Sequence, residues 1–347
     1  MKNFSALLID KNRTILDALK QLDEISSIAL TLFVTDDDKI IGSITDGDIR
    51  RTLIRGSNLC DSIVSVCNKN FYFVYKKDKN LYIEISKLKK KGIKFIPILS
   101  ENGQVVEIIN LKNKKSILPI DVVLMAGGRG ERLRPLTDTI PKPLLKIGNK
   151  PIIEHNIDRL IEYGIVSFFI TENYLAEQIV EYFGDGSTKG VKIHHILEPK
   201  KLGTFGSISL IEKFENDYVL VMNSDIFTKM DFFDFFNHFI LHDSDMSVAV
   251  IPYTLNIPFG VMNLEGREIR SLTEKPSYTY YTNSGIYLLK KDKLKYVPKA
   301  SFFNATDMIE MLINLECKVI RFPLTDLWID IGNPDDYKKA QELVRHL

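Results

Sequence analysis

The most informative segment runs from Val122 to Leu145 and reads VVLMAGGRGERLRPLTDTIPKPLL. It begins with a short apolar run, which is typical of a strand buried inside a parallel sheet. The glycines that follow let the backbone approach a ligand closely and expose N–H groups to phosphate oxygens. Arg132 can clamp a phosphate with two hydrogen bonds, and Lys142 can add a point charge. The segment therefore predicts a strand that leads into a loop for a phosphorylated ligand.

Two common glycine-loop motifs do not match this loop. The P-loop pattern needs a closing Gly-Lys-Ser/Thr, and the dinucleotide fingerprint needs a third glycine where Leu133 stands. The three glycines could also form a simple turn that connects the strand to the loop without binding a ligand. Such a turn does not explain Arg132 or Lys142 between its two prolines. We therefore favour a phosphate-binding loop that differs from the P-loop and from the dinucleotide motif.

Two aspartates follow apolar segments farther along the chain. Residues 219–223 read VLVMN and lead to Asp225, and residues 328–332 read WIDIG and contain Asp330. Aspartate often stands at strand ends because its side chain stabilises turns. Carboxylate oxygens are also the ligands that Mg²⁺ prefers, together with substrate phosphates and water. Asp225 and Asp330 are therefore candidate ligands for Mg²⁺.

The order of these motifs resembles the sugar-1-phosphate nucleotidyltransferases, from Leu118 to the end of the sequence. The resemblance also rests on Glu198-Pro199, Leu202–Ser207, Phe259–Val261, Glu274–Pro276 and Asn283–Tyr287. It implies an α/β domain of three layers, Rossmann-like and GT-A-like, with a mostly parallel sheet. It also implies an enzyme that joins an NTP to a hexose 1-phosphate, releasing pyrophosphate and forming an NDP-sugar.

The same resemblance implies roles for individual residues. Arg132 would grip the β- and γ-phosphates, and Lys142 would stabilise charge at the transferred phosphoryl group. Asp225 and Asp330 would hold Mg²⁺ as the cofactor. The residues implied to contact the nucleotide are Ala126, Gly127, Gly128, Gly130, Glu198, Gly203 and Thr204. The residues implied to bind the sugar phosphate are Gly260, Glu274, Lys275 and Asn283, with Lys275 on the phosphate and Glu274 on a sugar hydroxyl.

Glu198 carries the argument for the nucleobase. An ionised glutamate only accepts hydrogen bonds. Guanine presents two adjacent donors, N1–H and N2–H₂, whereas uracil and thymine present one donor between acceptors. The residue type therefore favours GTP. Uridylyl and thymidylyl transfer are alternatives, because related enzymes for other bases also carry glutamate here.

The first third of the chain differs in character from the rest. Residues 110–116 are polar and basic and lack apolar periodicity, as expected of a linker. Before Leu118 the chain has 20 Lys and Arg against 14 Asp and Glu, a formal charge of +6, whereas the remainder carries −5. We expect two domains, residues 1–117 and residues 118–347.

The N-terminal segment contains a weak repeat, since residues 14–44 and residues 81–109 both read helix, strand, turn, strand. It resembles a tandem pair of cystathionine-β-synthase (CBS) motifs, regulatory modules that bind adenine nucleotides in many proteins. By that resemblance, Thr45 and Asp48 of the segment GSITDGD, residues 42–48, would contact phosphate and ribose. A capping box at a helix start is the alternative for the same two residues.

The fusion of a CBS pair to this catalytic domain resembles the glucosamine-1-phosphate guanylyltransferases of bacterial legionaminic acid synthesis. It implies GDP-glucosamine as the product, for surface glycans, and a homo-oligomer, since CBS pairs usually associate with a second copy. A mannose-1-phosphate guanylyltransferase is an alternative within the same class. A nucleotide sensor with a vestigial catalytic domain is an alternative of another class, which the intact candidate site residues disfavour.

Composition and charge exclude several classes of protein. The formal net charge is +1, without the basic excess of a nucleic-acid binder. No apolar run approaches the length of a membrane span, and Asp10 interrupts the first segment before a signal-peptide core is complete. Three cysteines without close pairs argue against a disulfide framework or a structural zinc site. We expect a cytoplasmic protein without nucleic-acid or membrane partners.

Overall fold

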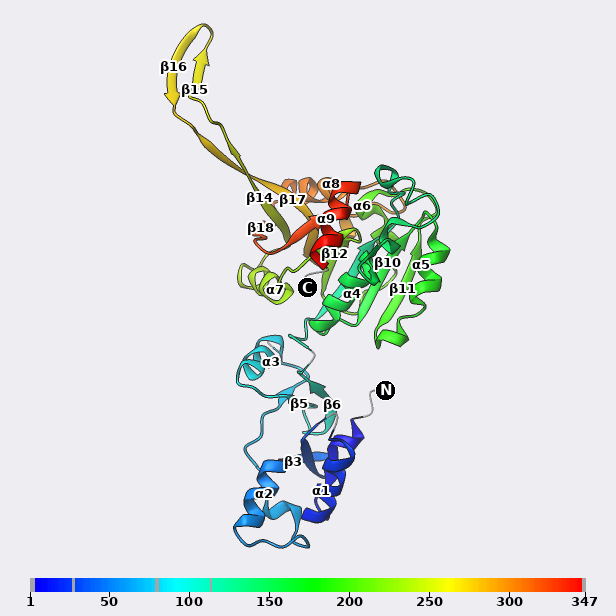
Figure 1. Ribbon diagram of the computed structural model, residues 1–347, viewed down its shortest axis with the longest axis vertical. Helices are drawn as coiled ribbons and strands as arrows, with labels where there is room; N and C mark the ends of the chain where they lie inside the picture. Colours follow the sequence, from blue (N-terminus) through cyan, green and yellow to red (C-terminus); the bar gives the residue numbers. More distant parts are fainter. Residues whose placement is uncertain (1–3, 27–28, 79–80, 113, 345–347) are drawn as a thin grey trace. The chain divides into compact units, whose positions relative to one another are not determined.

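The computed structural model describes residues 4–26, 29–78, 81–112 and 114–344. The chain divides into two compact units, Met1–Ile117 and Leu118–Leu347 (Figure 1). Among the described residues, none of the helices combines the length and the apolar character needed to cross a membrane.

The N-terminal unit consists of two halves with the same topology. Its helices and strands are β1 (Leu8–Asp10), α1 (Ile15–Glu24), β2 (Thr31–Asp36), β3 (Lys39–Thr45), α2 (Asp46–Ile54), β4 (Val74–Tyr75), α3 (Leu81–Lys90), β5 (Phe95–Leu99) and β6 (Val105–Asn110). In each half the first strand pairs in parallel with the second, and the second pairs antiparallel with the third. Phe95 and Ile108 of the second half pack into the core of the first. The predicted repeat is therefore confirmed.

The C-terminal unit is built around a seven-stranded sheet. Its helices and strands are β7 (Ile120–Met125), β8 (Lys146–Ile147), β9 (Lys150–Pro151), α4 (Ile152–Glu162), β10 (Ser167–Glu172), α5 (Ala176–Phe183), β11 (Lys192–Leu197), α6 (Gly203–Gly206), β12 (Tyr218–Asn223), β13 (Ile226–Thr228), α7 (Phe232–Leu241), β14 (Met246–Asn256), β15 (Val261–Glu265), β16 (Glu268–Thr273), β17 (Ser277–Lys290), α8 (Ala305–Asn314), β18 (Val319–Pro323), β19 (Trp328–Asp330) and α9 (Pro334–Val344).

The strand predicted at the start of the motif segment is β7, and it lies inside this sheet. The strand order is β11-β10-β7-β12-β17-β14-β18, and β7 pairs in parallel with both of its neighbours. Because β17 runs antiparallel to β12 and β14, the sheet is mixed, with four parallel pairings out of six. The apolar residues of β7 follow one another without alternating polar residues, because both faces of this strand are covered.

Helices cover both faces of the sheet. On one face Val219 and Val221 of β12 share a core with Phe303, Met308 and Leu312, the last two from α8. Tyr218 points to the opposite face, since side chains alternate along a strand, and there it contacts Phe236 and Phe239 of α7. The expected α/β fold with helices on both sides of a central sheet is thus confirmed.

Two strands continue beyond the sheet as an arm, residues 251–282, drawn in yellow tones in Figure 1. β14 pairs with β18 only as far as Val250, and β17 pairs with β12 only from Ile286 onward. Between these points and the tip the two strands pair only with each other within the described ranges, and the β15–β16 hairpin forms the end. The sequence patterns did not predict this arm.

Candidate active site

The glycine loop leaves the end of β7 and is shaped by close contacts. A Cβ atom on Gly127 would lie 2.9 Å from Oε1 of Glu198, and one on Gly130 would lie 2.9 Å from Cγ2 of Thr137. Gly130 also has a left-handed backbone, with φ of +63°, that favours glycine. Gly128 is different, because its Cβ would meet no heavy atom of the described residues within 4 Å. Packing inside the protein therefore explains Gly127 and Gly130 but not Gly128.

The two candidate aspartates come together although they are distant in sequence. β13 pairs antiparallel with β19, which places Ile226 opposite Asp330. The N–H of Ile331 donates to the carbonyl oxygen of Asp225 at 3.1 Å. The turn before β13 is tied to the end of β7, because the hydroxyl of Ser224 donates to the carbonyl of Met125 at 2.7 Å. Both aspartates thus lie beside the glycine loop.

Lys142 joins this group through an ion pair between its Nζ and Oδ2 of Asp225. The lysine is 8% exposed, so the pair is held in a mostly dry environment. Oδ1 of Asp225 is buried and has no hydrogen-bond partner in the part of the chain that the structure describes. Burial raises the pKa of Asp330, and the nearby charge of Asp225 raises this pKa further. A partly unsatisfied carboxylate pair of this kind would be stabilised by a cation.

The donor set fits Mg²⁺ better than a softer metal. Two carboxylates converge, and no group of three His, Cys, Asp or Glu side chains within the described ranges could hold a metal ion. Mg²⁺ is commonly held by one or two carboxylates, with substrate phosphates and water completing its shell. Asp225 and Asp330 would be the protein ligands of such an ion.

A cavity of about 790 Å³ opens between the glycine loop and Asp225. Its lining is rich in cations: Arg129, Arg132, Lys142, Lys200 and Lys201. Gly332 also lines the cavity, and a Cβ atom on this glycine would lie 3.6 Å from both Nη2 of Arg132 and Oδ2 of Asp330. This concentration of positive charge suits a polyphosphate.

A second cavity, of about 330 Å³, shares Gly127, Gly128, Lys201 and Asp225 with the first. Glu198 lines it and is 7% exposed. Burial raises the pKa of the Glu198 carboxyl, while the N–H of Leu202 donates to its Oε2 at 3.2 Å and opposes that rise. Glu198 is thus positioned to accept hydrogen bonds from a ligand in this cavity.

Gly203 and Thr204 line the same cavity at the start of α6. Gly203 has a φ of +79°, and its Cβ would lie 2.8 Å from the carbonyl oxygen of Phe303. The hydroxyl of Thr204 accepts a hydrogen bond from the N–H of Ala305 at 2.7 Å. Both residues therefore fix the loop that carries Glu198 against the start of α8. Ala126 lies before the loop, where its N–H donates to the carbonyl of Thr171 at 2.8 Å.

Several lining residues were missed by the sequence reasoning. Lys200 and Lys201 stand between two recognised segments, and their adjacent positive charges were the available signal. Asn223 ends β12 and lines the smaller cavity, where its side chain lies against the backbone of Gly285. Asn173 lines the larger cavity and donates to the carbonyl of Glu198 at 3.0 Å, a contact between distant segments that no local pattern reveals.

The four expected sugar-phosphate residues lie elsewhere. Gly260, Glu274 and Lys275 are exposed on the arm, and a Cβ on Gly260 would lie 3.1 Å from Oε2 of Glu274. Asn283 lies at the base of the arm, where its Nδ2 donates to the hydroxyl of Tyr287 at 2.7 Å. The structure therefore groups three of these residues with one another and does not bring them into the cavity beside Asp225.

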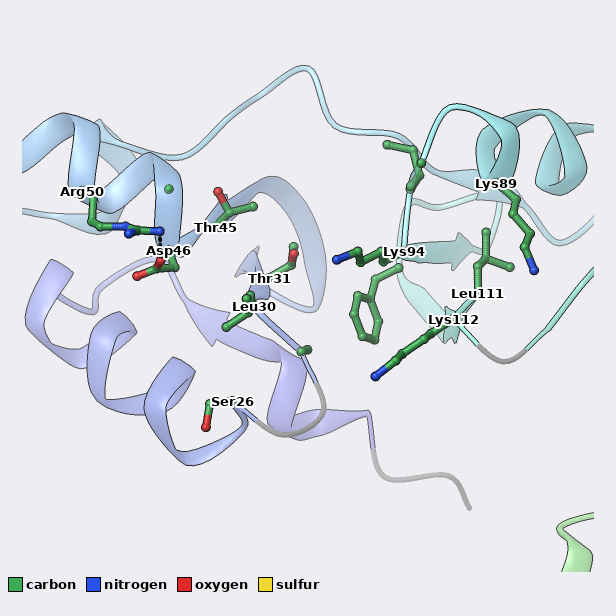
Figure 2. A pocket seen from close by; sticks show the side chains of 15 residues that line it. Ser26, Leu30, Thr31, Thr45, Asp46, Arg50, Lys89, Lys94, Leu111 and Lys112 are labelled. Atoms are coloured by element: carbon green, nitrogen blue, oxygen red, sulfur yellow. Dashed lines mark ion pairs between the residues drawn. The ribbon is translucent and has the colours of Figure 1, made fainter.

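The N-terminal unit has a separate cavity of about 650 Å³ between its two halves. Figure 2 shows Lys94 and Lys112 extending from the second half toward the first, with Lys94 directed at Thr31. Lys89 also lines the cavity, and Arg50 lines it while paired with Asp46 at 2.5 Å. The lining therefore carries an excess of positive charge, which suits an anionic ligand.

Thr45 and Asp48 form a capping box at the start of α2. The N–H of Asp48 donates to the Thr45 hydroxyl at 3.2 Å, and the N–H of Thr45 donates to Oδ2 of Asp48 at 2.9 Å. Partial burial tends to raise the pKa of Asp48, but hydrogen bonds from Thr45 and Arg51 outweigh it and lower this pKa. Thr45 lines the 650 Å³ cavity, whereas both residues line a neighbouring cavity of about 300 Å³.

Relatives with named activities match the C-terminal unit. A mannose-1-phosphate guanylyltransferase of Mycobacterium tuberculosis is 28% identical over 234 residues, which are 65% of this chain and 65% of that protein. The chain thus spans less than two thirds of the length of this relative. A D-glycero-alpha-D-manno-heptose 1-phosphate guanylyltransferase of Aneurinibacillus thermoaerophilus is 28% identical over 65% of this chain and 99% of its own length.

A solved structure agrees with the fold. HddC from Yersinia pseudotuberculosis, complexed with GMP-PN, superposes with a TM-score of 0.51 and 27% identity over 65% of this chain and 99% of HddC. A CBS domain model matches residues 5–55. A nucleotidyl transferase model matches residues 121–346, well over half of the chain. The chain therefore belongs to the nucleotidyl transferase family and carries an N-terminal CBS domain.

Proposed function

We propose that this chain transfers a nucleotidyl group from an NTP to a sugar 1-phosphate, releasing pyrophosphate and forming an NDP-sugar. One observation carries the proposal: Asp225 lines a cation-rich cavity whose glycine loop includes the unpacked Gly128, and Asp330 lies directly behind Gly332 of the same lining. Two polyanions must meet in this reaction, so neutralising and positioning their charges supplies most of the catalysis.

The catalytic residues we propose are Arg132 and Lys142. A sugar 1-phosphate is already ionised near neutral pH, so its oxygen can attack the α-phosphorus without a general base. Arg132 would bind the outer phosphates and the departing pyrophosphate, and Lys142 would stabilise the charge that develops on the transferred group. Asp225 and Asp330 would hold Mg²⁺, which neutralises phosphate charge when bound. A chelator is expected to abolish turnover.

We propose GTP as the nucleotide. Glu198 is buried in the smaller cavity and can accept hydrogen bonds from the adjacent N1–H and N2–H₂ donors of guanine. The named activities of the mycobacterial and Aneurinibacillus relatives, both guanylyltransferases, support the same choice.

The sugar we propose is mannose 1-phosphate or a manno-configured heptose 1-phosphate. This choice rests on the relatives, whose names support the mannose alternative rather than glucosamine 1-phosphate. GDP-glucosamine for legionaminic acid synthesis rests only on the order of the two domains and becomes the second candidate. The sugar-phosphate roles of Glu274 and Lys275 require the arm to meet a catalytic unit, because both residues lie on the arm.

For the N-terminal unit we propose an adenine nucleotide as regulator. The cation-rich cavity of Figure 2 supports a phosphorylated ligand, and Thr45 in its lining would contact the phosphate or ribose. The capping box around Asp48 gives this residue a structural role whether or not a ligand binds. An Asp48→Asn protein is therefore expected to lose stability as well as any nucleotide response.

The proposal is tested by following pyrophosphate release with Mg²⁺ for four NTPs against mannose, manno-heptose, glucosamine and glucose 1-phosphates. The expected result is the highest kcat/KM for GTP with a manno-configured sugar. A dominant combination of GTP with glucosamine 1-phosphate would favour the second candidate. A dominant UTP or dTTP row would show that Glu198 does not select the base as argued.

A further inference from the structure

We propose that the arm, residues 251–282, is a surface through which two copies of this chain associate. Near its base, the strand register places Tyr253 opposite Tyr280 and Leu255 opposite Tyr278. Because side chains alternate along a strand, these four share one face of the arm. Their exposures are 59%, 57%, 45% and 40% in that order. The arm therefore presents an apolar face, and the C-terminal unit itself leaves these four side chains about half exposed.

The opposite face is polar beyond its first pair, Pro252 with Tyr281, where the guanidinium of Arg321 lies 4.1 Å from the centre of the Tyr281 ring. Thr254 and Thr279 lie opposite each other, and their hydroxyl groups form a hydrogen bond at 3.2 Å. The next pair on this face is Asn256 with Ser277. Alternation between apolar and polar pairs is the pattern of a sheet with one face buried and the other in water.

The tip of the arm repeats this pattern. Met262 pairs with Leu272, and Leu264 pairs with Ile269, with exposures between 54% and 66%. The intervening pair is polar, since Nδ2 of Asn263 donates to the hydroxyl of Ser271 at 2.8 Å. Both strand pairs of the arm, β14–β17 near the base and β15–β16 at the tip, thus carry exposed apolar cross-strand pairs. An isolated two-stranded ribbon is marginal in water, which indicates that this surface gains stability from a covering partner.

The charge of the arm favours a second copy as that partner. It carries three acidic and three basic residues, which are Glu265, Glu268, Glu274, Arg267, Arg270 and Lys275. Arg270 pairs with Glu265 at 2.7 Å and with Glu268 at 2.8 Å, so part of this charge is neutralised within the tip. A neutral surface gives no attraction for nucleic acid or an anionic membrane, and it lets two identical copies meet without repulsion.

The residue types of the arm agree with this partner. The arm has 32 residues, and alternation along its strands places about half of them on the apolar face, which supplies part of the roughly 20–30 residues a side of a standard interface. Tyrosine, phenylalanine and methionine are enriched at interface centres. The arm has four tyrosines, together with Phe259 and Met262, which are 73% and 54% exposed. The arm can therefore supply a substantial part of a self-association surface, independently of the proposed chemistry.

The first test measures the mass of the full-length chain by sedimentation equilibrium across micromolar concentrations. Leu264→Glu combined with Tyr280→Glu is expected to weaken the association at least about tenfold, because each change places a charge in the apolar face. Leu241→Glu is the matched control, since Leu241 is 73% exposed on α7, outside the arm. The control should leave the mass unchanged. An unchanged mass in the double variant, or an equal loss in the control, would overturn the proposal.

The second test identifies which residues the arm contacts. It is informative even if the N-terminal units also associate with each other. Tyr280 is replaced by the photo-crosslinker p-benzoylphenylalanine, and ¹⁴N- and ¹⁵N-labelled proteins are diluted, mixed and concentrated so that subunits exchange. Mass spectrometry should find crosslinked peptides that join the two isotopes. Crosslinks only between peptides of the same isotope would show that the arm folds onto its own chain, and this would contradict the proposal.

Discussion

Gly128→Ala separates a ligand-binding role of the glycine loop from a packing role. A Cβ atom at this position would meet no heavy atom of the described chain within 4 Å, and the backbone φ of Gly128 lies outside the left-handed region. The alanine therefore fits the folded protein, and it restricts the unfolded chain. The free energy of unfolding should stay the same or rise by about 0.4–1 kcal/mol.

The same methyl group would occupy the cavity where the loop must approach the phosphates. A displacement of about 1 Å at a reacting group can cost roughly 100-fold in rate, so we expect kcat/KM for the NTP to fall at least that far. Urea unfolding and pyrophosphate release measure the two effects on one sample. Gly130→Ala is the contrasting variant, because its Cβ would lie 2.9 Å from Thr137 in a left-handed backbone and should lower stability. A Gly128→Ala protein with normal kcat/KM would refute the reasoning.

Three further predictions concern single side chains. Lys142→Met keeps the packing of a side chain that is 8% exposed but removes the cation from Asp225, so kcat should fall about 10²–10³-fold; wild-type kcat in steady-state assays would exclude the catalytic role. Glu198→Gln should lower kcat/KM for GTP about 10–100-fold relative to UTP, because a charged acceptor is lost; an unaltered ratio would remove Glu198 from base selection. The hydrogen bond from His195 to buried Glu172, at 2.6 Å, raises the pKa of His195 above its usual 6.5. Its stabilising contribution is fully present below about pH 6.5 and is lost as the pH rises through the folded-state pKa. His195→Gln should flatten this decline in urea unfolding measured from pH 6 to 8, and an unchanged slope would contradict the assignment.

The sequence was most informative where structure depends on local pattern. The apolar run before the glycine loop predicted β7 because a strand buried on both faces needs a continuous apolar segment. The repeat in the N-terminal unit was visible because each half encodes the same order of helix and strands. Thr45 and Asp48 illustrate an ambiguity of short motifs, since the same spacing serves a capping box and a nucleotide contact.

Other features depend on contacts that local patterns do not encode. Asp225 and Asp330 meet only because β13 pairs with β19, more than 100 residues apart in sequence. The two could be paired beforehand only through the family resemblance. The arm escaped prediction because the alternation in the outer parts of β14 and β17 is equally typical of strands in a sheet with one face in water. The Glu274-Lys275 motif does not reveal that these residues lie on the arm and not in the cavity beside Asp225, because the pairing of β14 with β17 determines their position.

The central claim is tested most directly by the identity and stoichiometry of the products formed from GTP, mannose 1-phosphate and Mg²⁺. Chromatography with mass spectrometry should detect GDP-mannose and pyrophosphate in equal amounts, and the Asp225→Asn protein should form neither at a comparable rate. Release of phosphate without an NDP-sugar, or no NDP-sugar from any of the four NTPs with any of the four sugar 1-phosphates, would contradict nucleotidyl transfer at this site.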